Sequence, residues 1–267
     1  MPYLSINHPI TEKVKNKNAN KQIIKVLTEH WTANNIFCPV CWSALDKHKI
    51  DKPINDLFCI DCKNDFELKS EKLKSKKWNF WKMLAWGSYK KAIEAIETKP
   101  MHLFVLKYSD DFTITNFLVV PKYFFTKNVI IKRPKALKGR SNYFMSDIDF
   151  SAIPESWKIH YINNWTYKTR TEILEEWNKV KFLEEIKDKK GTEKWEAKWW
   201  LLDIMLCIEK LDKKIFHLKE LDIFLEELQL KHPKNNYIKD KIRQKIQVLR
   251  DKWYLEFVDW KGNYKIL

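Results

Sequence analysis

The sequence lacks a hydrophobic run long enough to cross a membrane. Its longest apolar stretch, Trp199 to Ile208, contains Asp203 and is too short to span a bilayer. No secretory leader precedes the cysteines, so we expect a cytoplasmic protein whose thiols stay reduced. Internal repeats and low-complexity linkers are also missing. Because 45% of the residues are hydrophobic, the composition indicates a globular chain rather than a disordered one.

Histidine and glycine are scarce. The seven histidines are scattered over 267 residues and no nucleophile elbow is present, so nothing supports a serine, cysteine or histidine hydrolase. Of only four glycines, Gly191 lies in the polar stretch 187–194. We take this stretch as the boundary between two domains, residues 1–188 and residues 189–267, in a chain long enough for well-formed cores.

Acidic residues are few relative to basic ones. The chain has 35 Asp and Glu against 50 Lys and Arg, a formal net charge of +15. Such an excess favours a polyanionic partner, although a lysine-rich proteome accounts for part of it. We expect binding to nucleic acid, and neither a membrane nor a nucleotide cofactor.

Four of the five cysteines form two Cys-x-x-Cys pairs, Cys38/Cys41 and Cys59/Cys62, with seventeen residues between the pairs. Two such pairs at a spacing of about 15 to 20 residues are typical of zinc sites. Four thiolates complete a closed tetrahedral shell, which leaves no position for a substrate. The pattern therefore predicts a structural zinc ion, and disulfides are the alternative. Cys207, inside an apolar run, is expected to be a buried core residue.

Two carboxylates and a lysine lie in the same stretch. Polar and apolar residues alternate over residues 65–69, which predicts a strand with Glu67 and Lys69 on one face. Asp56, with ten residues between it and Glu67, can approach from the neighbouring strand of a hairpin. The two carboxylates would hold Mg²⁺, and Lys69 would orient or deprotonate the attacking water or neutralise the phosphorane charge. A solvated strand face is the alternative for so short a pattern.

The residues of this stretch resemble the PD-(D/E)xK nuclease superfamily and, more narrowly, the DpnI-like methyl-directed (type IIM) restriction endonucleases. The matching segments are LTEHW, FCPVC, KPINDLFCIDC and FELKS within residues 27–70, followed by NFLVVPKYF, SDIDFSAIP and KDKIRQKIQVLRDKWYLEF. The resemblance implies Asp56, Glu67 and Lys69 as catalytic residues and the four cysteines as zinc ligands. It also implies cleavage of double-stranded DNA at GATC sites with N6-methyladenine, in defence against foreign DNA. One departure is that Asn55 precedes Asp56, while the proline of the motif's name lies at Pro53.

The rest of the first domain predicts a mixed α/β nuclease core. Residues 121–140 carry seven Lys or Arg and no acid, and Pro134 and Gly139 favour a loop there. Next to it, Tyr143 is a candidate for insertion between DNA bases, or for packing on its own domain. The expected elements are helices at 21–33, 78–98 and 171–188, and strands at 102–108 and 112–120. Glu29, on the first helix, is expected to face solvent, and assistance at the active site is the alternative.

The C-terminal part predicts a winged helix, because three amphipathic helices precede a hairpin. The helices cover Leu201–Leu211, Leu218–Leu228 and Ile238–Leu249, and the strands cover Trp253–Val258 and Asn263–Leu267. The third helix is the basic one, which favours DNA over a protein partner. Its polar face carries Lys239, Arg243, Gln247 and Arg250 as candidate DNA-binding residues.

A methyl-directed enzyme must recognise an apolar group in the major groove. Trp253, Trp260 and Tyr143 are the candidates for that contact, although each is as typical of a protein core. The fold class is thus α/β: a PD-(D/E)xK core with an inserted four-cysteine zinc site, plus a C-terminal winged helix. A monomer and a transient dimer on DNA both remain open. The alternatives are a non-catalytic zinc and winged-helix transcription regulator, and an HNH nuclease, which the isolated His48 disfavours.

Overall fold

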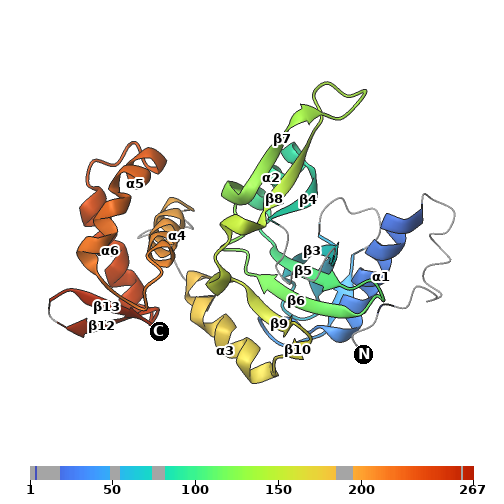
Figure 1. Ribbon diagram of the computed structural model, residues 1–267, viewed down its shortest axis with the longest axis horizontal. Coiled ribbons are helices and arrows are strands. Elements are labelled where there is room, and N and C mark those ends of the chain that lie inside the picture. The colour runs from blue at the N-terminus through green and yellow to red at the C-terminus, as the bar shows by residue number, and fades with distance from the viewer. Residues whose placement is uncertain (1–3, 5–18, 49–54, 74–81, 185–194, 260) are drawn as a thin grey trace. The chain divides into compact units, whose positions relative to one another are not determined.

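The computed structural model describes residues 4, 19–48, 55–73, 82–184, 195–259 and 261–267. The chain divides into two compact units, Met1–Trp177 and Asn178–Leu267 (Figure 1). The predicted domain boundary at 187–194 lies outside the described residues and stays a prediction. Within the described ranges, no helix combines the length and the apolar character that crossing a bilayer requires.

A seven-stranded mixed sheet forms the centre of the first unit, in the order β1-β2-β3-β5-β6-β9-β10. Strands β3 and β5 run parallel, and the other neighbouring pairs are antiparallel. The strands are β1 Leu45–Lys47, β2 Leu57–Cys59, β3 Asp65–Lys72, β5 His102–Tyr108, β6 Ile114–Val120, β9 Ile159–Asn163 and β10 Thr166–Tyr167.

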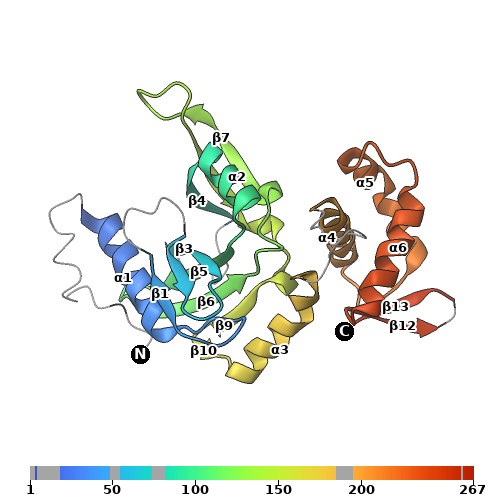
Figure 2. The same cartoon turned by 180° about the vertical axis from the view of Figure 1, so that it is seen from behind.

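The two central strands form the core of this sheet. Every residue of β5 and β6 is buried, as expected for the near-continuous apolar runs of a sheet that is covered on both faces. Helix α1 (Ala19–Asn35) lies against β1 and β3 (Figure 2). Helix α3 (Arg170–Lys181) contributes the buried Trp177, whose ring meets the edge of His102 at the start of β5. The strands predicted at 102–108 and 112–120 are therefore confirmed.

A second, three-stranded sheet in the order β4-β8-β7 packs on helix α2 (Tyr89–Thr98). It consists of β4 Met83–Ser88, β7 Ile130–Ala136 and β8 Phe144–Asp149. Strands β7 and β8 form a hairpin that projects from the body of the unit (Figure 1).

This sheet corrects two predictions. Residues 83–88 are strand rather than the start of a helix at 78–98, because their burial alternates with period two. Residues 130–136 are strand β7 rather than loop. Pro134 is tolerated there because β7 is an edge strand whose register shifts between Lys132 and Ala136. The helix predicted at 171–188 is also shorter, since α3 ends at Lys181 and a 3₁₀ turn, Phe182–Glu184, follows.

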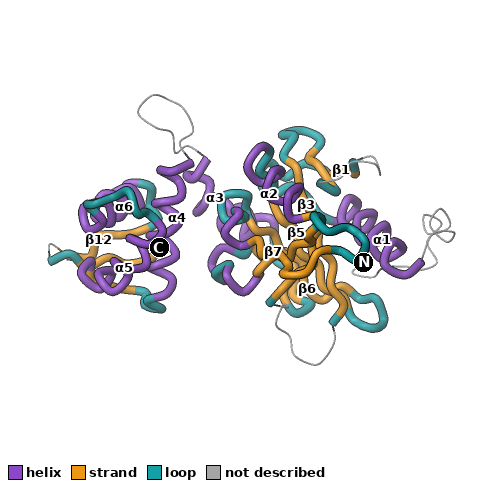
Figure 3. The backbone as a smooth tube through the Cα atoms, turned by 90° about the horizontal axis from the view of Figure 1, so that it is seen from above, coloured by secondary structure: helices purple, strands orange, loops and turns teal. Residues whose placement is uncertain are grey.

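The second unit is a winged helix, and Figure 3 shows its helices and small sheet by colour. Its three strands have the order β11-β13-β12, and β11 was not predicted. The predicted second helix proves to be a 3₁₀ helix, Leu218–Phe224, followed by a short α-helix. The elements are α4 Trp195–Lys210, β11 Ile215–His217, α5 Leu225–Lys231, α6 Ile238–Asp251, β12 Leu255–Asp259 and β13 Asn263–Ile266.

Candidate active site and metal centre

The four cysteines of the two pairs converge at one end of the β2–β3 hairpin. Their sulfur atoms all lie within 4.8 Å of one another, with Cys38 Sγ 3.5 Å from Cys62 Sγ and Cys41 Sγ 3.4 Å from Cys59 Sγ. Burial raises the pKa of Cys38 well above its ordinary value and that of Cys59 to about 11, so both thiols need a cation to ionise. Four cysteine sulfurs at this separation have the donor set of a tetrahedral zinc site.

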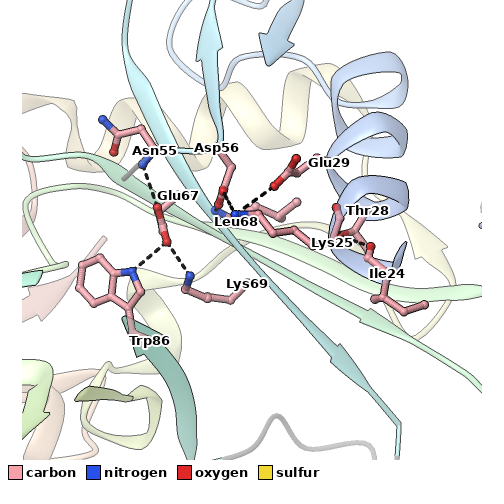
Figure 4. Close-up of polar contacts among 10 residues, drawn as sticks. All are labelled: Ile24, Lys25, Thr28, Glu29, Asn55, Asp56, Glu67, Leu68, Lys69 and Trp86. Atoms are coloured by element: carbon pink, nitrogen blue, oxygen red, sulfur yellow. Dashed lines mark hydrogen bonds and ion pairs between the residues drawn. The ribbon is translucent and has the colours of Figure 1, made fainter. Parts of the chain in front are cut away.

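The predicted hairpin brings Asp56 and Glu67 to adjacent strands. Asp56 precedes β2, and its backbone N–H donates to Phe66 O at 3.0 Å. Each carboxylate also accepts a backbone N–H from the opposite strand. Asp56 Oδ2 accepts from Leu68 N at 2.8 Å, and Glu67 Oε2 accepts from Asn55 N at 3.0 Å. These reciprocal bonds hold both side chains on the same side of the pairing (Figure 4).

Glu67 is buried, and its second oxygen, Oε1, has two further partners. Lys69 Nζ lies 2.5 Å away and Trp86 Nε1 donates at 2.8 Å. The Lys69 ammonium also lies 5.8 Å from the centre of the Trp86 ring. Trp86 belongs to β4 in the other sheet, and it approaches Glu67 beside Lys69 (Figure 4). Glu67 and Lys69 thus lie together, as the alternation of residues 65–69 predicts. The Glu67 carboxylate, however, is buried rather than exposed to solvent.

Helix α1 provides a cation and a third carboxylate beside Asp56. Lys25 Nζ lies 2.9 Å from Asp56 Oδ1 and 3.4 Å from Glu29 Oε1. Burial alone would raise the pKa of Asp56, but the positive charges of Lys69 and Lys25 prevail and lower it. Burial, together with the charge of Asp56, raises the pKa of Glu29 to about 7. At neutral pH, Asp56 is therefore ionised, whereas Glu29 is only partly ionised.

The candidate DNA-binding residues lie on two separate elements. On α6, the side chains of Lys239, Arg243, Gln247 and Arg250 are all exposed. The three cations form surface ion pairs: Lys239 with Asp222 (3.0 Å), Arg243 with Asp240 (3.7 Å) and Arg250 with Asp251 (2.8 Å). Exposed pairs of this kind are worth about 1 kcal/mol or less, so phosphates can replace the carboxylates.

Two of the three aromatic candidates are described. Tyr143 is half-buried near the tip of the β7–β8 hairpin, with the Arg140 guanidinium 5.6 Å from its ring centre. Trp253 follows α6 and is 82% exposed in a left-handed conformation with φ of 61°. Trp260 lies outside the described residues.

Sequence reasoning missed Trp86, Lys25 and the backbone N–H of Asn55. Trp86 was assigned to a helix, and its contact with Glu67 joins two sheets, so no local pattern marks it. Lys25 lies four residues before Glu29 on α1 and thus on the same helical face. This spacing could have identified Lys25 as a neighbour of Glu29 from the sequence.

The described residues thus combine a mixed sheet with two carboxylates and a lysine at one hairpin, a four-cysteine cluster at the end of that hairpin, and a separate winged helix. Residues 4–186 match the family described as DpnI, Dam-replacing family, and residues 196–266 match the Dam-replacing HTH domain. The chain belongs to this Dam-replacing DpnI family of type II restriction endonucleases.

One solved structure, described as "Restriction endonuclease in complex with substrate DNA", is similar over 67% of this chain and 96% of that chain. The identity is 14% and the TM-score is 0.31. The family assignment rests on the two matches above.

Replacing a zinc ligand tests the cysteine cluster. We expect the wild-type protein to carry one zinc ion per chain and Cys59→Ser to lose it. Zinc binding at such sites is worth on the order of 10 kcal/mol, comparable to the stability of a whole domain, so the first unit should also lose its cooperative unfolding. Elemental analysis and thermal unfolding measure both effects. Cys207→Ser, a change at a buried cysteine outside the cluster, is the control and should keep its zinc. Full zinc content in Cys59→Ser would contradict the assignment.

The protonation of Glu29 is a second test. Because its pKa in the folded protein is about 7 against an ordinary 4.5, folding retains a proton between these values. The unfolding free energy should therefore fall as pH rises through that window. In the Mg²⁺-free protein, the Glu29 carboxyl ¹³C shift should titrate with a midpoint near 7. Asp56→Asn should lower that midpoint, since the Asp56 charge helps to raise it. A wild-type midpoint near 4.5 would show that neither burial nor the Asp56 charge raises the pKa of Glu29.

Proposed function

We propose that this restriction endonuclease hydrolyses double-stranded DNA at GATC sites carrying N6-methyladenine, and that Asp56, Glu67 and Lys69 form its Mg²⁺-dependent active site. The observation that carries the catalytic part is the pairing of Asp56 and Glu67 across one hairpin, each held by a backbone N–H of the opposite strand. The methyl and sequence preferences rest on the family to which the chain belongs.

The donor set at this hairpin fits a hard divalent cation. Asp56 and Glu67 offer carboxylate oxygens, the ligand type that Mg²⁺ prefers. Asp56 Oδ1 already has a cation beside it, the Lys25 ammonium at 2.9 Å, which shows that the position around this oxygen favours positive charge. When bound, Mg²⁺ would polarise the scissile phosphodiester and lower the pKa of the attacking water.

The side chains would divide the remaining work. Asp56, whose pKa is lowered, stays ionised and holds negative charge where a cation is needed. Lys69, held beside Glu67, would orient or deprotonate the attacking water or stabilise the negative charge of the phosphorane. Lys25 would leave Asp56 when the metal binds, which frees a second ammonium for a phosphate oxygen.

Two elements would contact DNA. Helix α6 presents Lys239, Arg243, Gln247 and Arg250, in the position of a recognition helix that enters the major groove. The β7–β8 hairpin carries basic side chains toward a tip that includes Arg140 and Tyr143. Lysine and arginine supply phosphate affinity, so binding should weaken steeply with salt, while base-edge and methyl contacts supply specificity.

Methyl recognition would use an exposed aromatic surface. N6-methylation leaves adenine one N–H donor and adds an apolar group, so discrimination favours an apolar contact. Trp253 has a largely free ring directly after α6, and Tyr143 lies near the hairpin tip. Trp260 remains a third candidate from the sequence alone.

The cysteine cluster would hold structural zinc. Thiolate ligands need a reducing compartment, and we therefore propose that the protein works in the cytoplasm. We propose that it uses no nucleotide cofactor. It would act as a monomer or as a transient dimer on the DNA.

Digestion of matched plasmids tests the proposal. One plasmid carries adenine methylation at GATC and its twin does not. We expect wild-type protein with Mg²⁺ to produce discrete fragments from the methylated plasmid alone. Asp56→Asn should slow cleavage by about 100- to 1,000-fold or more, because it removes charge stabilisation at the reacting centre, while DNA affinity persists. The control Asp46→Asn changes an exposed carboxylate of β1 and should cut normally.

Each contrary outcome has a defined meaning. Tight binding without cleavage of either plasmid would favour the alternative function, a zinc and winged-helix transcription regulator. Cleavage of both plasmids would keep the active site and contradict methyl direction. In the same assay, Trp253→Ala or Tyr143→Ala should erase the preference for methylated DNA if that ring reads the methyl group. A purely structural ring would lower stability and leave the ratio unchanged.

A further inference from the structure

We infer that Trp86 is a positioning residue, which orients the Glu67 carboxylate through its indole N–H so that one oxygen is left to face a cation. The inference rests on the proposed function, because it concerns the residues that would hold the metal. It starts from a side chain on the other sheet that the motif does not include.

Trp86 is placed by an irregularity in its strand. The pairing of β4 with β8 is regular from Met83 to Ala85 and shifts register before Ser88, so the bulge falls at Trp86 and Gly87. Bulges increase local twist and re-aim side chains, and they are frequent next to active sites. Ser146 Oγ donates to Gly87 O at 3.1 Å, which holds the bulged backbone to β8.

The indole ring is fixed after it leaves the strand. Trp86 is 8% exposed, and its ring centre lies 5.2 Å from that of Phe125. Packing on this aromatic partner leaves the ring little rotational freedom, so the direction of the N–H is set by the fold. Lys69, the other donor to the same oxygen, has a long, partly exposed side chain and must be free to act on the substrate. Trp86 is thus the donor that stays when Lys69 moves.

The hydrogen bonds of Glu67 show how the fixed Trp86 N–H orients its carboxylate. A carboxylate oxygen has two lone-pair positions. Oε1 accepts from both Trp86 Nε1 and Lys69 Nζ and is filled, whereas Oε2 accepts only from Asn55 N among the bonds of the described residues. Rotation of the carboxylate would break the Trp86 and Asn55 bonds together. Trp86 therefore helps to keep one acceptor position of Oε2 available, on the hairpin that also carries Asp56.

Two other buried tryptophans, Trp157 and Trp177, do not share this arrangement. The indole nitrogens of Trp157 and Trp177 are buried and have no hydrogen-bond partner in the described part of the chain. Both rings nevertheless pack on other rings, Trp157 on Phe124 and Trp177 on His102. These two residues serve the core through shape alone, and they provide matched controls for removing an indole N–H.

The test removes the N–H without changing the ring. Trp86 is replaced by 3-benzothienylalanine, in which sulfur takes the place of the N–H, and separately by phenylalanine in Trp86→Phe. Outer partners that orient metal ligands are worth about 10- to 100-fold in affinity or activity. Both variants should therefore bind Mn²⁺ about 10- to 100-fold more weakly in a calorimetric titration without DNA. They should also show a reduced kcat on methylated DNA, with KM and zinc content unchanged. The same benzothienyl replacement at Trp177 should leave all of these quantities as in the wild type.

The possible failures are separable. If wild-type protein neither cleaves DNA nor binds Mn²⁺ outside the cysteine cluster, the proposed function fails and this inference with it. If wild type cleaves and binds Mn²⁺ but the benzothienyl variant at Trp86 matches it, the nuclease stands and the positioning role is overturned. If only Trp86→Phe is impaired, together with its thermal midpoint, Trp86 acts through packing and the inference is wrong.

Discussion

The antiparallel pairing of residues 56–58 with residues 65–66 is the constraint on which the candidate site depends. Leu57 pairs with Phe66 and Phe58 pairs with Asp65. Continued by one residue, this register places Asp56 beside Glu67 on the neighbouring strand. A slip of one residue would turn every side chain of β3 to the other face of the sheet. The turn is tied by Cys59 N–H, which donates to Asn64 O at 2.9 Å, and by the cysteine pair Cys59/Cys62 within it. The cysteine cluster and the two carboxylates therefore lie at opposite ends of one short hairpin.

The same hairpin concentrates charge that the fold must compensate. Glu67 is 5% exposed, and a buried carboxylate without partners would be costly. Asn55, Trp86 and Lys69 satisfy Glu67, while Leu68 and Lys25 satisfy Asp56. The two lysine ammonium groups approach oxygens that a divalent cation would also attract. Two lysines of the chain thus balance the charge of these carboxylates, and under the proposed function Mg²⁺ would replace Lys25 at Asp56.

The sequence predicted the parts of this site that local spacing defines. Two Cys-x-x-Cys turns, the alternation around Glu67 and the near-continuous apolar runs of β5 and β6 each depend on neighbours in the chain. Strand β4 was missed because its first four residues, MLAW, are all apolar, so neither a period of two nor one of 3.6 stands out. Strand β7 was missed because Pro134 favours a loop in general, and only an edge position with a register shift permits it. Trp86 was missed because its partner lies nineteen positions away in another sheet, which no window reveals.

Anomalous X-ray diffraction from crystals of the native protein soaked in Mn²⁺ would locate both metal sites. We expect two peaks per chain, distinguished by wavelength: zinc among Cys38, Cys41, Cys59 and Cys62, and manganese between Asp56 and Glu67. Lys25 should have left Asp56, and Trp86 should still contact Glu67 Oε1. A zinc peak alone, with the Lys25 ammonium still on Asp56 at saturating Mn²⁺, would contradict the assignment of this hairpin as the catalytic metal site.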